Sequence, residues 1–198
     1  DIADRAAREE LVAEAVCAFG RVDALVNVAA NGGSRAPVAE LDWEAYLEAV
    51  RLNVVATMTL CGLVAAPMRA AGGGAIVNIG ALSSTTLLPK MAAYTSTKAA
   101  MVVASKTMAR EVGLDGIRVN VVTPGFTTGA PLDAMLAQMA ERTGGDAREL
   151  SRRAAREAAL ERHVDPDDIA EAVLFLASER GRNVTGVELH VNAGLWVG

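Results

Sequence analysis

Short apolar runs alternate along this chain with longer segments in which apolar residues recur every three or four positions. The short runs predict buried β-strands, and the amphipathic segments predict helices. The strands are expected at 22–28, 75–80, 117–122 and 187–191, and the helices at 4–19, 42–70, 91–113 and 166–178. Parallel strands whose connecting helices cover both faces of the sheet produce this alternation. The pattern therefore predicts an α/β fold with a doubly wound parallel sheet.

Residues that start and stop secondary structure stand at the expected boundaries. Asp4 precedes the first helix, where its carboxylate can cap free N–H groups, and Gly20 follows that helix. Glycines 72–74 end the long second helix, and Pro124 followed by Gly125 ends the third strand. The local signals therefore agree with the hydrophobic pattern.

Composition and charge narrow the class of partner. Of the 198 residues, 52% are hydrophobic but only 4% aromatic, which suffices for a core built mainly of Ala, Val and Leu. No repeat or linker divides the sequence, so we expect a single domain over 1–198. The formal charge of −5 argues against nucleic acid or an anionic membrane as partner, since both attract clustered Lys and Arg. A small molecule is the expected partner.

The sequence indicates a cytoplasmic location. It shows neither the pattern of a signal peptide nor an uninterrupted apolar run of roughly 18 residues, so no membrane span is expected. Cys17 and Cys61 fall in predicted helices without metal-ligand spacing. We therefore expect buried thiols in a reducing compartment, with no disulfide and no metal site.

Tyr94 and Lys98 form the first candidate for chemistry. They stand four residues apart near the start of a predicted helix, so the phenol and the ammonium share one face. A phenol is a weak acid-base catalyst near neutral pH, and lowering its pKa by about 3 units requires roughly 4 kcal/mol of preference for phenolate. A nearby cation supplies part of this preference. The spacing alone is weak evidence, because solvated helix faces show it too.

Further motifs accompany this pair at the ends of the predicted elements. They are Asn27-Val28-Ala29-Ala30, Asn53 in the long helix, Asn78-Ile79-Gly80, Arg118-Val119-Asn120, Pro124-Gly125 and Val191-Asn192-Ala193-Gly194. With them, essentially all of 1–198 resembles the classical short-chain dehydrogenases/reductases. The resemblance implies a Rossmann-like fold and an NAD(P)-dependent oxidoreductase.

The resemblance assigns roles to particular residues. Tyr94 would exchange a proton with an alcohol or carbonyl oxygen while hydride moves to or from the nicotinamide of NAD or NADP. Lys98 would lower the pKa of Tyr94 and bind the nicotinamide ribose, and Asn53 would anchor a proton-relay water. Other residues would border the cofactor: Asp1 and Ile2 at the adenine, Asn27 and Ala29 at the adenosine, and Pro124 and Gly125 at the nicotinamide. The alternative for the three asparagines Asn27, Asn53 and Asn78 is that they satisfy buried backbone groups at the ends of elements.

Three departures from the family pattern qualify these assignments. The family's Gly-rich turn, which meets the cofactor pyrophosphate, has no counterpart here, so we expect a sheet missing its first βαβαβ elements and exposing strand 22–28 at its edge. Ala81 stands where the family places a substrate-orienting serine. Ser83 has the same strand parity and is the expected replacement. Gly129 replaces a threonine that contacts the carboxamide, which leaves this contact to Thr127 or Thr128.

Segment 126–160 resembles the family's substrate lid. Its apolar residues Leu132, Met135, Leu136 and Met139 recur at helical spacing, which predicts either an apolar substrate pocket or packing on the core or a neighbouring subunit. Four arginines follow, and a solvated face is favoured over a grip on an anionic carrier: Arg148, Arg152, Arg153 and Arg156. Family members are commonly homotetramers that associate through the helices equivalent to 42–70 and 91–113, which implies a homo-oligomer here.

Two functional hypotheses follow. The first is an oxidoreductase that interconverts a secondary alcohol and a ketone, with an apolar substrate. The second is a short homologue without redox activity, acting as a lyase, an isomerase or a silent partner subunit. Ala81 and the absent Gly-rich turn favour the second hypothesis, whereas Tyr94, Lys98 and Asn53 together favour the first.

Overall fold

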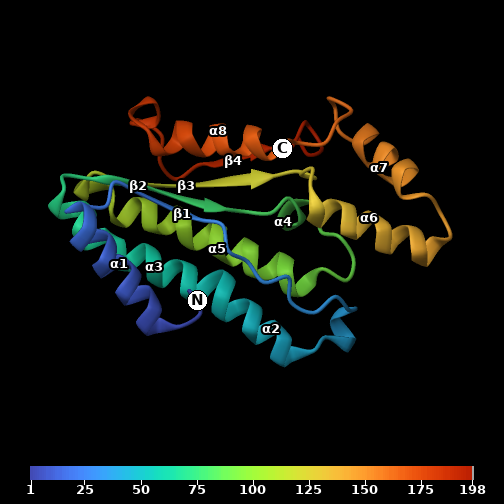
Figure 1. The fold of residues 1–198 in the computed structure, drawn as a ribbon, viewed down its shortest axis with the longest axis horizontal. Coiled ribbons are helices and arrows are strands. Elements are labelled where there is room, and N and C mark those ends of the chain that lie inside the picture. The colour runs from blue at the N-terminus through green and yellow to red at the C-terminus, as the bar shows by residue number, and fades with distance from the viewer. Residues whose placement is uncertain (198) are drawn as a thin grey trace.

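The computed structural model describes residues 1–197 and contains a four-stranded, entirely parallel sheet. In spatial order its strands are β1 (Ala24–Asn27), β2 (Gly74–Ile79), β3 (Ile117–Pro124) and β4 (Glu188–Val191). Figure 1 shows α3 (Thr57–Ala70) and α5 (Ala92–Glu111) on one face of the sheet and α8 (Pro166–Ala177) on the other. This arrangement confirms the predicted α/β class and the parallel sheet covered on both faces.

Local chemistry explains where the first helix starts and stops. In α1 (Arg5–Phe19) the Asp4 carboxylate accepts a hydrogen bond from the N–H of Ala6. Gly20 closes the helix with φ +77°, and its N–H donates to the carbonyl of Val16. Both boundaries agree with the sequence signals, because a short acidic side chain and a left-handed glycine satisfy the free groups at helix ends.

The remaining helical segments include several short ones that the sequence pattern did not predict. They are η1 (Val38–Glu40), α2 (Trp43–Val50), η2 (Arg51–Ala56), α4 (Ser83–Thr86), η3 (Gly113–Asp115), α6 (Ala130–Thr143), α7 (Ala147–Arg156) and η4 (Glu179–Gly181). The helix expected over 42–70 is continuous but irregular, because η2 is a π-helical stretch between α2 and α3. Periodicity does not reveal such a widened turn, and π-helical turns frequently occur at functional sites.

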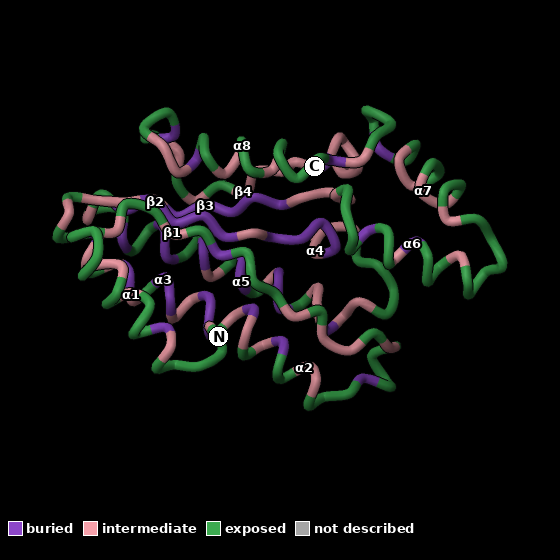
Figure 2. The backbone as a smooth tube through the Cα atoms, in the orientation of Figure 1, coloured by how far each residue is buried: buried purple, intermediate pink, exposed green. Residues whose placement is uncertain are grey.

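The core lies on both faces of the central strands, which are the buried part of the tube in Figure 2. Below the sheet, side chains of α3 and α5 pack against β2 and β3 in one cluster: Cys61, Val64, Met68, Ile76, Met108, Ala109, Val112, Ile117 and Val119. Above it, Leu176 of α8 packs against Val77 and Val122. Burial on both faces explains why these strands are continuous apolar runs.

Strand β1 lies at the edge of the described sheet, as expected. Val26 is 41% exposed and Val28 is 65% exposed. The apolar side of α1 is only partly used, since Val12 packs against the core whereas Phe19 is 80% exposed. The expectation that both cysteines are buried is wrong for Cys17, which is exposed, and right for Cys61.

One continuous helical segment in residues 1–197, Trp43–Ala70, is long and apolar enough to cross a membrane by length and composition. No membrane span is predicted here from the sequence, because polar residues interrupt the apolar run. Its residues Leu60, Val64 and Met68 are buried, and Val64 and Met68 belong to the core cluster beneath the sheet. A core helix of a globular fold passes the same test of length and composition.

Candidate active site

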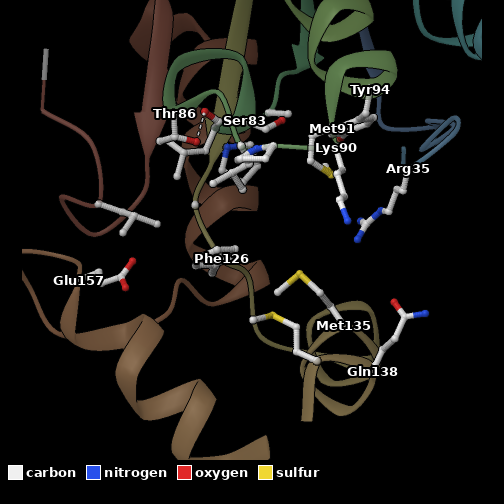
Figure 3. Close-up of a pocket in the computed structure, with 18 of the residues that line it drawn as sticks. Arg35, Ser83, Thr86, Lys90, Met91, Tyr94, Phe126, Met135, Gln138 and Glu157 are labelled. Carbon is white, nitrogen blue, oxygen red and sulfur yellow. Dashed lines mark hydrogen bonds between the residues drawn. The ribbon is translucent and has the colours of Figure 1, made fainter. Parts of the chain in front are cut away.

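A cavity of about 1060 Å³ opens where β2 and β3 end. Its walls come mainly from four parts of the chain: residues 79–83 at the end of β2, 86–94 up to the start of α5, 124–126 at the end of β3, and the inner side of α6 (Figure 3). Arg35, Glu157 and Leu195 complete the lining. Ligands of open parallel sheets bind at the carboxyl ends of the strands. The position of this cavity therefore makes it the candidate active site.

Tyr94 lies in the first turn of α5 and lines this cavity. Lys98 follows one turn later on the same face, and its ammonium nitrogen lies 6.0 Å from the centroid of the Tyr94 ring. Lys98 is only 3% exposed, and its Nζ donates a hydrogen bond of 2.7 Å to the carbonyl of Ile79. The predicted helical spacing therefore brings the phenol and the amine together at the end of β2.

The electrostatics differ from the expectation that Lys98 lowers the pKa of Tyr94. Burial raises the pKa of Tyr94 above its ordinary value, and the positive charge that opposes this rise is that of Arg35. Burial also lowers the pKa of Lys98 to about 8. Lys98 is itself desolvated, and its Nζ donates to the Ile79 carbonyl, so its effect on the pKa of Tyr94 stays a prediction.

The turn after β2 places Ala81 and Ser83 in the cavity wall. The chain does not stay extended, as the parity argument assumed, because it enters α4 at Ser83. Ser83 is nevertheless 8% exposed and lines the cavity, and its hydroxyl has no hydrogen-bond partner within residues 1–197. By contrast, Ser84 Oγ donates to the Ala81 carbonyl at 2.7 Å. A buried hydroxyl without a partner is costly, and a ligand oxygen in the cavity could satisfy it.

Asn53 lies within the π-helical stretch η2 and is 1% exposed. Its Oδ1 accepts a hydrogen bond from the N–H of Asn31 at 2.7 Å. Its Nδ2 donates to the carbonyl of Asn31 at 2.8 Å and to Thr97 Oγ1 at 2.9 Å. Both amide hydrogens are thus used, and the side chain holds the loop after β1 against α5. These contacts agree with the alternative that Asn53 satisfies buried backbone groups.

Asn27 also turns inward. Its Nδ2 donates to Asn78 Oδ1 at 2.8 Å, and Asn78 Nδ2 donates to Ser105 Oγ at 2.8 Å. Ser105 Oγ in turn donates to the carbonyl of Met101 at 2.7 Å. The amide side chains therefore link β1, β2 and α5. Their partners are other side chains, and not the backbone groups that the alternative for Asn27 and Asn78 expected.

The other residues expected at the cofactor separate into two groups. Pro124 and Gly125 line the cavity, whereas four residues do not belong to its wall: Asp1, Ile2, Ala29 and Thr127. The Thr127 hydroxyl donates to the carbonyl of Gly125 at 3.1 Å. The carbonyl of Ile2 accepts a hydrogen bond from Arg8. The structure thus brings the expected nicotinamide end, but not the expected adenine end, to this cavity.

Each of the two interpretations of the apolar lid residues holds for two of the four residues. Met135 and Met139 line the cavity, whereas Leu132 and Leu136 are buried. The four arginines that follow are exposed, and Arg152 pairs with Glu149 at 2.7 Å. They form the solvated face that the sequence favoured.

Sequence reasoning missed the three cationic residues of the cavity wall: Arg35, Lys90 and Arg142. They come from the loop after β1, the turn before α5 and the end of α6. No local spacing connects them, because only the tertiary fold brings them around one cavity.

A parallel sheet with a Tyr94 and Lys98 pair beside a cavity at its carboxyl edge defines an α/β enzyme of the nucleotide-binding type. The family model described as enoyl-(acyl carrier protein) reductase matches residues 1–196. D-threitol dehydrogenase of Mycolicibacterium smegmatis is 34% identical over 199 residues, which cover 98% of this chain and 70% of that protein. The chain therefore belongs to the short-chain dehydrogenase/reductase family of oxidoreductases.

Solved structures show the same relationship. L-sorbose reductase from Gluconobacter frateurii, complexed with NADPH and L-sorbose, superposes with a TM-score of 0.92 at 31% identity, covering 100% of this chain and 75% of that one. NAD⁺-bound xylitol dehydrogenase superposes with a TM-score of 0.90 at 26% identity, covering 98% and 76%. The described chain thus matches about three-quarters of each solved relative.

Proposed function

We propose that this protein interconverts a secondary alcohol and a ketone with NAD or NADP, and that Tyr94 transfers the proton. The observation that carries the proposal is the cavity wall itself. Tyr94 and Ser83 line the cavity, and the Ser83 hydroxyl has no hydrogen-bond partner within residues 1–197. Lys98 lies on the same face of α5 as Tyr94, behind the cavity wall. The NADPH and NAD⁺ complexes of the two structural relatives support either coenzyme.

The residues at the end of the sheet fit the nicotinamide part of such a coenzyme. Lys98 Nζ makes one hydrogen bond, to Ile79, so two of its three N–H donors remain for ribose hydroxyls. Pro124 and Gly125 supply an adjoining wall of the cavity. The bound nicotinamide supplies or accepts the hydride.

In the direction of ketone reduction, the Tyr94 hydroxyl donates its proton to the oxygen of the carbonyl group. The raised pKa of Tyr94 keeps the phenol protonated at neutral pH, which suits this donation. Ser83 Oγ donates a hydrogen bond to the same oxygen and replaces the donor that Ala81 lacks. Alcohol oxidation reverses the proton transfer and requires the phenolate, so the same residue favours oxidation at higher pH.

Substitution of the two tyrosines tests this function. In the intact gene product, Tyr94→Phe removes only the phenol oxygen, and we expect turnover of ketones and secondary alcohols to fall about 10²-fold or more. Tyr46→Phe is the matched control. The Tyr46 hydroxyl accepts a hydrogen bond from Ser96 at 3.3 Å, and Tyr46 does not line the cavity. Unchanged turnover in Tyr94→Phe would refute the proposed role of Tyr94.

A second candidate, a non-redox or silent homologue, is favoured by Ala81, which places a methyl group in the cavity wall. Titration with NADH and NADPH, followed by fluorescence, separates the two functions. Binding of either coenzyme together with ketone turnover supports the oxidoreductase. Absence of binding in the intact gene product supports the second candidate.

We also propose a cytoplasmic homo-oligomer, of the homotetrameric type, which associates through the long helices. The support is a set of exposed apolar side chains on α2, η2 and α5: Trp43, Leu47, Val55 and Val103. Exposed apolar residues that gather on adjoining helices are typical of subunit interfaces.

A further inference from the structure

Positive charge gathers around the candidate active site. Arg35, Lys90 and Arg142 line the cavity, and Glu157 is the only carboxylate among its lining residues. The chain as a whole has a formal charge of −5, so this wall has the opposite sign to the rest of the molecule. A concave wall of one sign attracts ligands of the other.

Arg35 and Lys90 lie on the Tyr94 side of the cavity. Their cationic ends point toward one another beside Met91, whereas Glu157 lies across the cavity near Phe126 (Figure 3). Two like charges that face each other repel, and an anion between them would relieve this repulsion.

These cations have no protein partner in the part of the chain that the structure describes. Arg35, Lys90 and Arg142 form neither an ion pair nor a side-chain hydrogen bond within residues 1–197. Several other exposed cations do form ion pairs, with carboxylates outside the cavity: Arg5, Arg21, Arg69, Lys106 and Arg152. The wall thus keeps its positive charge free for a ligand.

The backbone at Lys90 is unusual as well. Lys90 has φ +64° and Leu87 has φ +49°, a conformation that residues other than glycine rarely adopt. The turn that joins α4 to α5 therefore brings Lys90 to the cavity wall through a disfavoured backbone. Residues held in such conformations cluster at ligand-binding sites.

We propose that the substrate of this enzyme carries an anionic group, a carboxylate or a phosphate, which Arg35 and Lys90 bind. This inference rests on the proposed function, because the same substrate presents its ketone or alcohol oxygen to Tyr94. The apolar remainder of the substrate lies against Met135 and Met139 of α6, which also line the cavity.

Matched substrate pairs test the inference on the intact gene product with NADH and NADPH. One pair is an oxo acid and its amide, and the other is a hydroxyketone phosphate and its unphosphorylated form. We expect kcat/KM to be at least about tenfold higher for the anionic member of one pair, as a charge-assisted hydrogen bond provides. The pair that shows the preference identifies the anion. Added salt should reduce the preference.

The double variant Arg35→Gln/Lys90→Asn should abolish this preference by raising KM for the anionic member of the pair. Because the charge of Arg35 opposes the rise in the pKa of Tyr94, kcat for both members of a pair should change together. Asn suits position 90 because it tolerates positive φ. Arg110→Gln is the control, since Arg110 is an exposed cation at the far end of α5 and does not line the cavity. Equal kcat/KM within both pairs, with turnover that depends on Tyr94, would overturn the anion inference and leave the proposed function intact.

Calorimetry with the oxo acid and the phosphate separates failure of the proposed function from failure of the anion inference. If no ketone is reduced, the proposed function fails, and the anion inference is then judged on binding alone. Binding by the wild type that is lost in the double variant supports it. Absence of binding by both compounds, or equal binding by the double variant, overturns it.

Discussion

Four hydroxyl side chains follow one another in α4, and three of them are hydrogen-bonded within the turn. Ser84 donates to the Ala81 carbonyl, and Thr85 and Thr86 donate to the carbonyl of Leu82. Among these four, only the hydroxyl of Ser83 has no partner within residues 1–197. At the scale of single residues, this difference separates a candidate substrate contact from groups that only complete a turn.

Removal of the Ser83 hydroxyl should therefore affect catalysis and not stability. We expect Ser83→Ala to lower kcat for ketone reduction on the order of 10²-fold, the usual effect of losing one donor to a developing oxyanion. Its free energy of unfolding should stay equal to that of the wild type or rise slightly, because no hydrogen bond is lost. Steady-state kinetics and urea unfolding measure the two effects.

The neighbouring hydroxyl provides the matched control. Ser84→Ala should leave kcat unchanged, since Ser84 Oγ is bound to the Ala81 carbonyl and does not line the cavity. Ala81→Ser should raise kcat in the Ser83→Ala background, because it restores a donor in the same wall. Full activity of Ser83→Ala would contradict the proposed role of Ser83.

At the scale of secondary-structure elements, buried polar side chains connect strands and helices through hydrogen bonds. Such bonds are directional, whereas apolar packing is not. The Asn27, Asn78 and Ser105 side chains link β1, β2 and α5 through hydrogen bonds of 2.8 Å. Asn53 and Asn31 similarly fix the loop after β1 against η2. A buried hydrogen-bond network of this kind helps to specify one arrangement of the elements around the cavity.

The network predicts a stability effect. Asn78→Ala leaves the amide of Asn27 and the hydroxyl of Ser105 without their buried partner, so we expect the free energy of unfolding to fall by about 2–4 kcal/mol. Urea denaturation measures this change. Asn183→Ala is the control, because Asn183 is an exposed residue between η4 and β4 and should change stability by less than about 0.5 kcal/mol. Equal stability of the two variants would show that the network contributes little.

At the scale of the whole molecule, exposed apolar side chains define where subunits are expected to meet. Val103 on α5 is 65% exposed, and Trp43 on α2 is 57% exposed. These helices are the ones through which the proposed homo-oligomer associates. A charge placed there would have to be buried in the interface, which is unfavourable without a partner.

We expect Val103→Asp to reduce the oligomeric state of the intact gene product, measured as molar mass by light scattering. Leu114→Asp is the control, because Leu114 is fully exposed in the short η3 turn just beyond the C-terminal end of α5. Its mass should match that of the wild type. An unchanged mass in Val103→Asp would place the subunit interface elsewhere.

The sequence by itself determined the order of strands and helices, because burial on both faces of a parallel sheet leaves continuous apolar runs such as 117–122. It also determined the Tyr94 and Lys98 pair, since helical spacing is a local property. Short-range signals of this kind are fixed by neighbours along the chain, and they carried the resemblance to the family.

The tertiary structure alone decided what surrounds that pair. The chain enters α4 at Ser83, and Asn27 and Asn53 form hydrogen bonds with partners inside the fold. The positive charge that opposes the raised pKa of Tyr94 is that of Arg35 and not that of Lys98. The tertiary structure also brought Arg35, Lys90 and Arg142 around one cavity. These residues are far apart in sequence, and hydrogen bonding and electrostatics depend on distances in space that only the folded chain sets.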